Sequence, residues 1–353
     1  EWLFEHLGLP IQKLNPTGDP STDALSLLRL KSYHIAPQLV LTYKRNEKYL
    51  GYLESWLRWS ERDSRLHTVF TMTRVRGGRL SSEDPNLQQV KVGWRDIFLG
   101  PFVAADYGQV ELRVPAKLSG DPALVKAMCA PVGTREADIH AQNVERVFGI
   151  SYEAQQWAGF NLDLRTRAKN YMFGALYLSE GREVRDVIEA QLLSDDQLDV
   201  PVPSEKEIHD AIFTIRDSYP VLFDEWIPAA LEKCRERGGW GYTLFGRPFY
   251  LPDIIGADKH KRKRAERQCI SRHIQGTASD LMRFALHSVR ERIIAGRVVR
   301  SAQDELVFEL APGANLEVVI RDVRECMELG QPLAPIPLVV DVTVSNTWKE
   351  CHK

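Results

Sequence analysis

The sequence has no long hydrophobic run, almost no net charge and no closely spaced cysteines. Its longest apolar stretches, such as the one around residues 338–340, fall far short of the roughly 20 residues needed to cross a bilayer. We therefore expect no membrane anchor and a reducing, cytosol-like compartment. Lys and Arg total 46 against 48 Asp and Glu, a formal charge of -2, so the overall charge does not favour a polyanionic partner.

The five cysteines are odd in number and widely spaced, with neither a CxxC pair nor a neighbouring His cluster. We therefore expect neither structural zinc nor a disulfide framework. Positive charge does concentrate in one short segment, at Lys259, Lys261, Arg262, Lys263, Arg264 and Arg267. Such a cluster is typical either of a phosphate-binding surface or of a solvated helix face.

At 353 residues the chain is long enough for two or three lobes with a cleft. Apolar periodicity predicts helices at residues 24–30 and 50–59 and throughout 138–237, with an interruption near Pro201 and Pro203. Alternation and short apolar runs predict strands at residues 66–79, 102–105, 298–310 and 338–344. A helical insertion that splits a sheet indicates an α+β fold.

Asp106 directly follows the buried-looking strand at residues 102–105, and a helix is predicted to begin near Tyr107. Its carboxylate would lie at a strand end, where sheet proteins often place functional side chains. An ordinary N-cap for the following helix is an equally good interpretation of this motif alone.

Asp304 and Glu305 lie between two apolar runs that predict a tight hairpin. Gln303-Asp304 is not a favoured hairpin dipeptide, so acidic residues at this tip suggest chemistry. The alternative is a solvent-exposed polar turn. If strands bring Asp106 and Asp304 together, two Mg²⁺ ions are the expected ligands, because hard cations prefer oxygen donors and no His or Cys lies nearby.

Arg165, Lys169, Phe173 and Tyr177 follow one another at four-residue steps in a helix-compatible segment. This spacing places all four on one face, where two cations could hold a triphosphate and two rings could face a sugar and base. Aromatic residues at such spacing are more often part of a core. Gly174 costs about 1 kcal/mol relative to Ala inside a helix, which predicts close approach by another group.

These segments resemble the three motifs of the family A DNA polymerases, the group of bacterial DNA polymerase I. Residues 106–113 are similar to motif A, residues 165–177 to motif B and residues 303–309 to motif C. Further similarity covers residues 78–88, 138–140, 243–247, 251–253 and 273–280. The three motifs occur in the expected order, and the resemblance spans nearly the whole chain.

The resemblance implies a right-hand polymerase fold with an antiparallel palm sheet, helical fingers and a partial helical thumb. The expected segments are a thumb at residues 1–60, palm at 61–124 and 263–353, and fingers at 125–262. It also implies a DNA-directed DNA polymerase that adds dNTPs to a primer 3′ end by two-metal phosphoryl transfer.

The resemblance implies roles for individual residues. Asp106 and Asp304 would ligate two Mg²⁺ ions, for which Mn²⁺ can substitute, with the Tyr107 carbonyl as a further ligand and Glu305 as support. The dNTP would contact Arg165, Lys169, Phe173, Tyr177, Gln109, Glu111 and His140, with Lys169 also catalytic and Glu111 as the gate that excludes a ribose 2′-hydroxyl. The primer–template duplex would contact Arg79, Asn86, Gln88, Arg267, Gln275 and Gln303.

Three departures from the family pattern qualify this prediction. Gln303 stands where His is usual, Gly108 where Ser is usual, and Leu178 where Gly normally follows Tyr177. We expect altered but retained extension. A catalytically weak DNA-binding module and RNA-templated activity are the alternatives, and retention of Asp106, Asp304, Arg165 and Lys169 argues against the binder.

The first half of the family's thumb is missing from the sequence, so we expect a piece of a larger chain that carries N-terminal nuclease domains. A monomer is the expected state, without membrane association. The expected location is the cytoplasm, in a nucleoid or a virus-infected host cell, with an organelle as the alternative.

Overall fold

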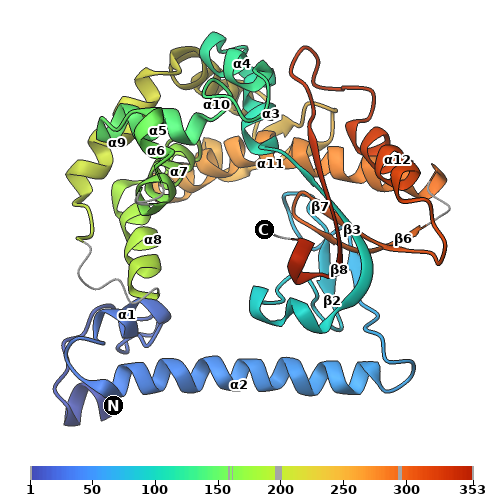
Figure 1. Cartoon of the computed structure of the whole chain (residues 1–353). Coiled ribbons are helices and arrows are strands. Elements are labelled where there is room, and N and C mark those ends of the chain that lie inside the picture. The colour runs from blue at the N-terminus through green and yellow to red at the C-terminus, as the bar shows by residue number, and fades with distance from the viewer. Residues whose placement is uncertain (1, 158–159, 161, 195–200, 293–295, 352–353) are drawn as a thin grey trace. The chain divides into compact units, whose positions relative to one another are not determined.

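The computed structural model describes residues 2–157, 160, 162–194, 201–292 and 296–351 (Figure 1). It divides into two compact units, each built from two chain segments. The first unit comprises Glu1–His67 and Asn161–Phe213, and the second comprises Thr68–Phe160 and Thr214–Lys353. None of the helices in the described ranges combines the length and hydrophobicity needed to cross a bilayer.

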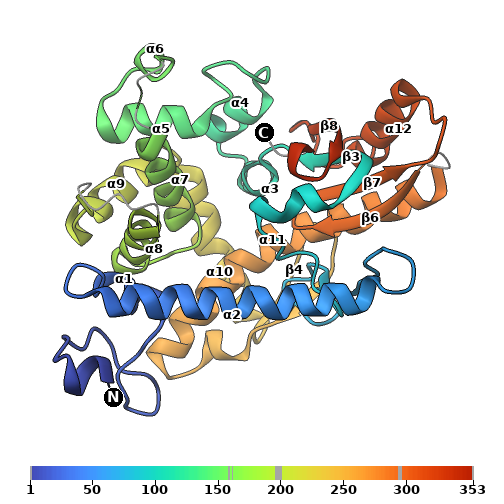
Figure 2. The same ribbon diagram turned by 60° about the horizontal axis from the view of Figure 1, so that its bottom comes forward.

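The first unit is helical. Its elements are η1 (Trp2–His6), α1 (Ala24–Arg29), α2 (Ile35–Ser60), α7 (Leu162–Leu176), α8 (Gly181–Ser194) and the beginning of α9 (Glu205–Asp217). Asp23 caps α1 by accepting a hydrogen bond from the Ser26 backbone N–H, as the sequence predicts. Helix α2 is far longer than the predicted residues 50–59, and Figure 2 shows it as one continuous helix.

An ion-pair network fastens α1 to α8 within this unit. The guanidinium of Arg29 lies 2.7 Å from Asp186 and 2.6 Å from Glu189. On the other side of α1, Leu27 and Leu30 are fully buried in a small apolar core. The short helix α1 is therefore held by packing on one face and by charge on the other.

The second unit contains a four-stranded antiparallel sheet in the order β6-β7-β3-β8. The strands are β3 (Leu99–Tyr107), β6 (Gly296–Ala302), β7 (Glu305–Leu310) and β8 (Val340–Thr347). Two small sheets pair β1 (Val69–Thr71) with β2 (Ser81–Glu83) and β4 (Trp240–Tyr242) with β5 (Pro248–Tyr250). The predicted α+β class and the antiparallel sheet are confirmed.

Helices surround this sheet in sequence order. They are η2 (Val92–Ile97), α3 (Val110–Ser119), α4 (Pro122–Cys129), α5 (Ile139–Phe148), α6 (Tyr152–Gln155), η3 (Val221–Trp226), α10 (Ile227–Glu236), η4 (Pro252–Ile255), α11 (Lys259–Arg292), α12 (Leu316–Glu328) and η5 (Lys349–Cys351). Helix α12 packs on β3 and β8, and Figure 1 shows it beside the sheet. The buried Tyr107 hydroxyl donates a 2.7 Å hydrogen bond to the Met327 carbonyl of α12.

Two local predictions were wrong. Strand structure predicted over residues 66–79 is limited to β1, because the backbone carbonyls of residues 72–78 bind arginine side chains in place of a strand partner. The helix predicted to start near Tyr107 begins at Val110, with Gln109 as its N-cap at φ 54°. Asp106 therefore does not cap this helix, and the capping interpretation of its carboxylate fails.

Candidate active site

Pairing of β3 with β7 brings the two predicted acidic motifs together. Asp106 lies directly opposite Glu305, and the Tyr107 N–H donates a 3.1 Å hydrogen bond to the Asp304 carbonyl. The predicted hairpin is confirmed, because Ala302 pairs with Glu305 and leaves a two-residue tip. Asp304 is half-buried at this tip, which does not fit a freely solvated turn.

A third acidic residue, Asp341, joins this row from the other side of β3. It lies opposite Asp106 in the β3–β8 register, and the Gly108 N–H donates a 2.9 Å hydrogen bond to the Val339 carbonyl. The sequence analysis missed Asp341 as a site residue. The signal was present, because a single acid interrupts the apolar strand predicted at residues 338–344, but the register that makes it a neighbour of Asp106 is a tertiary property.

The electrostatics of this row favour a bound cation. The Asp106 side chain retains solvent contact, yet burial by surrounding protein, and then the negative charges of Asp304, Glu305 and Asp341, raise its pKa to about 7. Burial likewise raises the pKa of Asp304 to about 6, opposed by Arg79 and assisted by Glu111. Carboxylates that repel one another and are poorly hydrated are stabilised when a divalent cation replaces their protons.

The donor set fits Mg²⁺ better than a metal that needs a cage of side chains. Across residues 2–157, 160, 162–194, 201–292 and 296–351, no group of three or more His, Cys, Asp or Glu side chains is arranged to hold a metal ion. Mg²⁺ in nucleotide-dependent enzymes is typically bound by one or two carboxylates, with waters and substrate phosphates as its other ligands. Asp106 and Asp304, with the nearby Tyr107 backbone, match this arrangement.

Glu305 is engaged in a buried ion pair with Arg300. Both side chains are under a tenth exposed, and the Arg300 guanidinium also lies 4.1 Å from the centre of the Trp348 ring. Burial lowers the pKa of Arg300 to about 10, an effect that Glu305 opposes. The carboxylate of Glu305 is therefore held below the row of acids by a structural partner, and its supporting role stays a prediction.

The predicted sugar gate, Glu111, forms an ion pair with a predicted DNA contact. The Arg79 guanidinium lies 2.6 Å from the Glu111 carboxylate. Glu111 lies in the first turn of α3, directly after the Asp106 segment. Because arginine carries five N–H donors, this pair leaves donors of Arg79 for a second partner.

Three arginines hold the loop that precedes Arg79. Arg247 donates to the Gly77 and Gly276 carbonyls at 3.2 and 2.9 Å and pairs with Asp280 at 2.5 Å. Arg272 donates to the Arg76 carbonyl, and Arg283 donates to the Met72 and Gly78 carbonyls. We refer to these three side chains as the arginine clasp, which lies between the β4–β5 region, α11 and the loop at residues 72–78.

Gly78 shows how tightly the clasp is packed. Its φ is +87°, and a Cβ placed there would lie 2.6 to 2.7 Å from the Arg247 guanidinium. Only glycine adopts this backbone conformation without strain, and only glycine leaves room for the guanidinium. The clasp therefore fixes the backbone immediately before Arg79.

The remaining predicted contacts in this unit are spread over several elements. Gln109 and Gln303 are exposed at φ 54° and 50°, beside Asp106 and Asp304, and left-handed backbone at non-glycine residues often marks functional positions. The Gln88 amide donates to the Leu80 and Ser301 carbonyls, so it supports the fold. The other predicted contacts are Asn86 in the loop after β2, His140 in the first turn of α5, and Arg267 and Gln275 on α11.

Helix α7 of the first unit carries the predicted stripe. The buried face of this helix is formed by Ala168, Met172 and Leu176. Lys169 is exposed, and the rings of Phe173 and Tyr177 are half-buried and stack with their centres 6.2 Å apart. These rings lie outside the buried face, so the interpretation of both as core residues fails.

Two further features of α7 bear on the sequence analysis. A Cβ at Gly174 would lie 2.7 Å from a Val184 methyl group, which confirms the predicted close approach. Leu178, which stands where the family has Gly, adopts φ 54° in the cap that ends α7.

The family A DNA polymerase sequence profile matches residues 1–350 of this chain. The chain belongs to DNA polymerase family A. Members of this family generally depend on divalent metal ions. Family membership agrees with the row of acids on β3, β7 and β8.

Individual relatives in the family cover nearly all of the chain. The thermostable DNA polymerase I of Thermus aquaticus is 36% identical over 363 residues, which is 98% of this chain and 40% of that protein. DNA polymerase I of Mycobacterium bovis is 32% identical over 366 residues, again 98% of this chain and 37% of that protein. The chain thus spans about two fifths of the length of these curated relatives.

A solved structure shows the same fold. The POL domain of Pol1 from M. smegmatis, in complex with DNA primer-template and dNTP, superposes with a TM-score of 0.82 and 27% sequence identity. The match covers 99% of this chain and 60% of that one.

Proposed function

We propose that this chain is the polymerase portion of a DNA-directed DNA polymerase, which joins dNTPs to a primer 3′ end and releases pyrophosphate. The observation that carries the proposal is the convergence of Asp106 and Asp304, whose raised pKa values favour a cation, in a chain of family A. The M. smegmatis relative binds DNA primer-template and dNTP, which supports the same partners for this chain.

Asp106, Asp304 and the Tyr107 carbonyl would hold two Mg²⁺ ions, with Mn²⁺ as a substitute. Bound there, the ions would activate the primer 3′ hydroxyl and stabilise the leaving pyrophosphate. The protein's own part is to keep the two carboxylates together through the β3–β7 pairing. Asp341 adds negative charge to the same row.

The nucleotide would be held by cations and donors that neutralise charge on the triphosphate. Arg165 and Lys169 on α7 supply the charges, and Gln109 and His140 supply further donors. The stacked pair Phe173 and Tyr177 offers an aromatic surface to the base and sugar.

Sugar selection would depend on Glu111, whose carboxylate Arg79 holds in place. A ribose 2′-hydroxyl would clash with this carboxylate, while a deoxyribose would pack against it. Duplex contacts would come from Arg79, Asn86, Gln88, Arg267, Gln275 and Gln303. We assign a thumb to residues 1–60, palm to 61–124 and 263–353, and fingers to 125–262.

The test is extension of a primed template by the purified chain with Mg²⁺ and dNTPs, on DNA and RNA templates in parallel. We expect extension on DNA, with deoxynucleotides preferred over ribonucleotides. No extension at any enzyme concentration overturns the proposal in favour of a DNA-binding module. Equal or faster extension on RNA overturns the DNA-directed assignment.

A further inference from the structure

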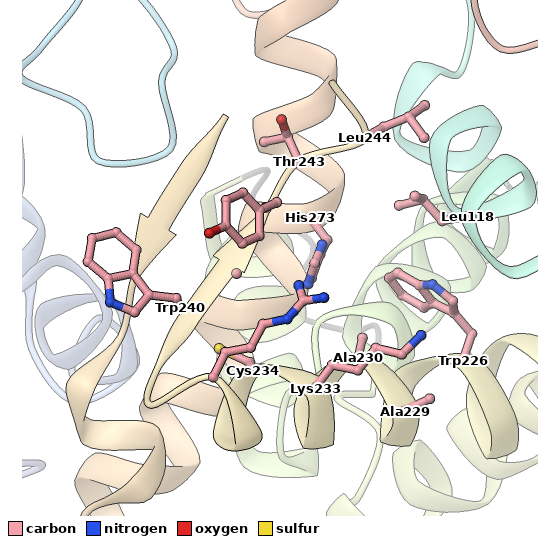
Figure 3. Close-up of a pocket in the computed structure, with 13 residues that line it drawn as sticks. Leu118, Trp226, Ala229, Ala230, Lys233, Cys234, Trp240, Thr243, Leu244 and His273 are labelled. Atoms are coloured by element: carbon pink, nitrogen blue, oxygen red, sulfur yellow. The ribbon is translucent and has the colours of Figure 1, made fainter. Parts of the chain in front are cut away.

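A pocket in the second unit lies away from the row of acids. It is enclosed by η3 and α10, the β4–β5 hairpin, the middle of α11 and the end of α3. Figure 3 shows Trp226 and Lys233 along one wall, His273 projecting from α11, and Leu118 and Leu244 closing the far side. None of the residues assigned above to metal, dNTP or DNA lines it.

The walls of the pocket suit a flat aromatic ring. Trp226, Trp240, Tyr242 and His273 contribute rings, and the accessible volume is about 190 Å³. A cavity of about 150 Å³ accommodates benzene, so this pocket has room for one heterocycle. The His273 ring is itself fixed edge-on by Trp226 and Phe249, with ring centres 5.9 and 5.1 Å away.

The charges that line the pocket are positive. Lys233 and Arg237 extend from α10 and its C-terminal end, and none of the described lining residues is acidic. Burial lowers the pKa of His273 to about 4, so this imidazole is neutral at pH 7 and its ring is available for packing. Arg237 lies over the Tyr242 ring at 5.5 Å, which positions a guanidinium at the aromatic wall.

The aromatic surface continues beyond the pocket along the hairpin. Trp240 stacks on Tyr250, its partner in the β4–β5 register, with ring centres 4.8 Å apart. Trp240 is 45% exposed and Tyr250 is 51% exposed. Aromatic rings beside cations are the usual means of binding single-stranded nucleic acid, because every base has a face to stack.

The pocket also opens on a different side of α11 from the predicted primer contact. His273 and Gln275 are two residues apart on one helix, which separates their side chains by about 200°. We propose that this pocket binds one unpaired nucleobase together with its phosphate, the base between the aromatic walls and the phosphate at Lys233 and Arg237. The stack of Trp240 on Tyr250 favours a base within a single strand over a free nucleotide.

Photo-crosslinking tests the site directly, with the full chain and without primer or dNTP. The probes are an eight-nucleotide DNA strand with one 5-iodouracil, and 5-iododeoxyuridine monophosphate as the free nucleotide. We expect crosslinks to Trp226, Trp240 or Tyr242, more efficiently with the strand. Efficient crosslinking by the monophosphate alone keeps the pocket chemistry but overturns the strand as its source. Crosslinks confined to other residues overturn the proposal.

Matched variants separate this site from general charge. Arg237→Gln removes one of the two pocket cations and should weaken binding of the strand about tenfold, the usual effect of losing a charge-assisted contact. Arg235→Gln removes the same charge from the same segment, but Arg235 pairs with Glu266 at 2.7 Å and does not line the pocket, so binding should persist. Equal loss in both variants overturns the proposal.

A strand with an abasic site at the probed position provides the second control. It should bind about as weakly as a Trp240→Leu variant binds the intact strand, because both lack the stacking contact. Unchanged affinity for the abasic strand would show a phosphate site without base recognition and would overturn the proposal. Because no assay here requires extension, failure of this site and failure of the polymerase proposal are distinguishable.

Discussion

Tyr107 and Asp304, from two motifs far apart in the chain, are joined by a 3.1 Å backbone hydrogen bond. This bond continues the β3–β7 ladder up to the hairpin tip, so the carboxylates of Asp106 and Asp304 are neighbours because of backbone pairing. The acidic site is therefore built on a rigid sheet, and its side chains can be changed without removing the framework that places them.

Replacing either carboxylate by its amide tests the site without a change of size. Asp106→Asn and Asp304→Asn should each lower the extension rate by at least about a hundredfold, since loss of metal coordination removes several kcal/mol of transition-state stabilisation. Duplex affinity, measured by fluorescence anisotropy, should change little. Asp210→Asn, an exposed acid on α9, is the matched control and should extend normally. Normal extension by both site variants would show that the chemistry lies elsewhere.

Cation binding should depend on pH in a defined direction. Because the pKa of Asp106 is raised from 3.8 to about 7, the folded protein holds a proton there that the unfolded chain has lost. Without metal, this group's contribution to stability therefore falls as pH rises from about 4 to about 7. Mg²⁺ or Mn²⁺ must displace that proton, so cation affinity should rise over the upper part of this range.

Thermal unfolding with and without Mn²⁺ measures this linkage. The cation should raise the melting temperature little at about pH 5 and clearly at about pH 8. Asp106→Asn should abolish most of that difference. A cation effect of equal size at both pH values would contradict the raised pKa values.

The Arg300–Glu305 pair predicts an effect on stability. Each of Glu305→Leu and Arg300→Met leaves one buried charge without its partner, which typically costs about 3–5 kcal/mol. The double variant removes both charges and should be more stable than either single variant. Urea unfolding followed by tryptophan fluorescence measures this, since Trp348 contacts Arg300. A double variant as unstable as the sum of the singles would show that the pair is not coupled.

Arg247 should act on sugar selection through the loop that it holds. Arg247→Lys keeps the charge opposite Asp280, but a single ammonium cannot bind the Gly77 and Gly276 carbonyls in the same geometry. Because this loop leads into Arg79, which holds Glu111, we expect up to about tenfold weaker discrimination between dNTP and rNTP in kcat/KM. Arg321→Lys, an exposed pair with Asp322, is the control.

The outcome distinguishes a positioning role from general support of the fold. If Arg247→Lys lowers the melting temperature and the rates with both sugars equally, Arg247 is only structural. A selective change with rNTPs, and a Gly78→Ala variant that behaves alike, supports transmission through the backbone, because a Cβ at Gly78 would collide with the same guanidinium.

Local patterns in the sequence predicted the elements that carry the site. The strand before Asp106, the tight hairpin at Asp304 and the helix with its stripe were all found, because alternation, an apolar run and four-residue spacing are properties of short segments. The close approach at Gly174 was predicted for the same reason. A glycine inside a helix carries a local cost that packing must offset.

Features that depend on contacts across the chain were not predicted. Asp341 becomes a site residue only through the β3–β8 register, and the clasp joins Arg247 to Gly77 across 170 positions. Residues 72–78 were expected to be a strand because their pattern alternates, whereas their carbonyls bind distant arginines. Sequence periodicity does not report which side chains will satisfy a backbone.

Leu178 predicts a stabilising substitution at the end of α7. The Leu178 and Ser179 N–H groups donate to the Ala175 and Gly174 carbonyls, which forms a Schellman cap with Leu178 in the left-handed position. A side chain with a Cβ costs about 1–2 kcal/mol there relative to glycine. Leu178→Gly should therefore slow hydrogen exchange of these two amides and raise the melting temperature, whereas Leu178→Ala, which keeps the Cβ, should not. Equal stabilisation by both variants would show that backbone strain at this cap is not the cause.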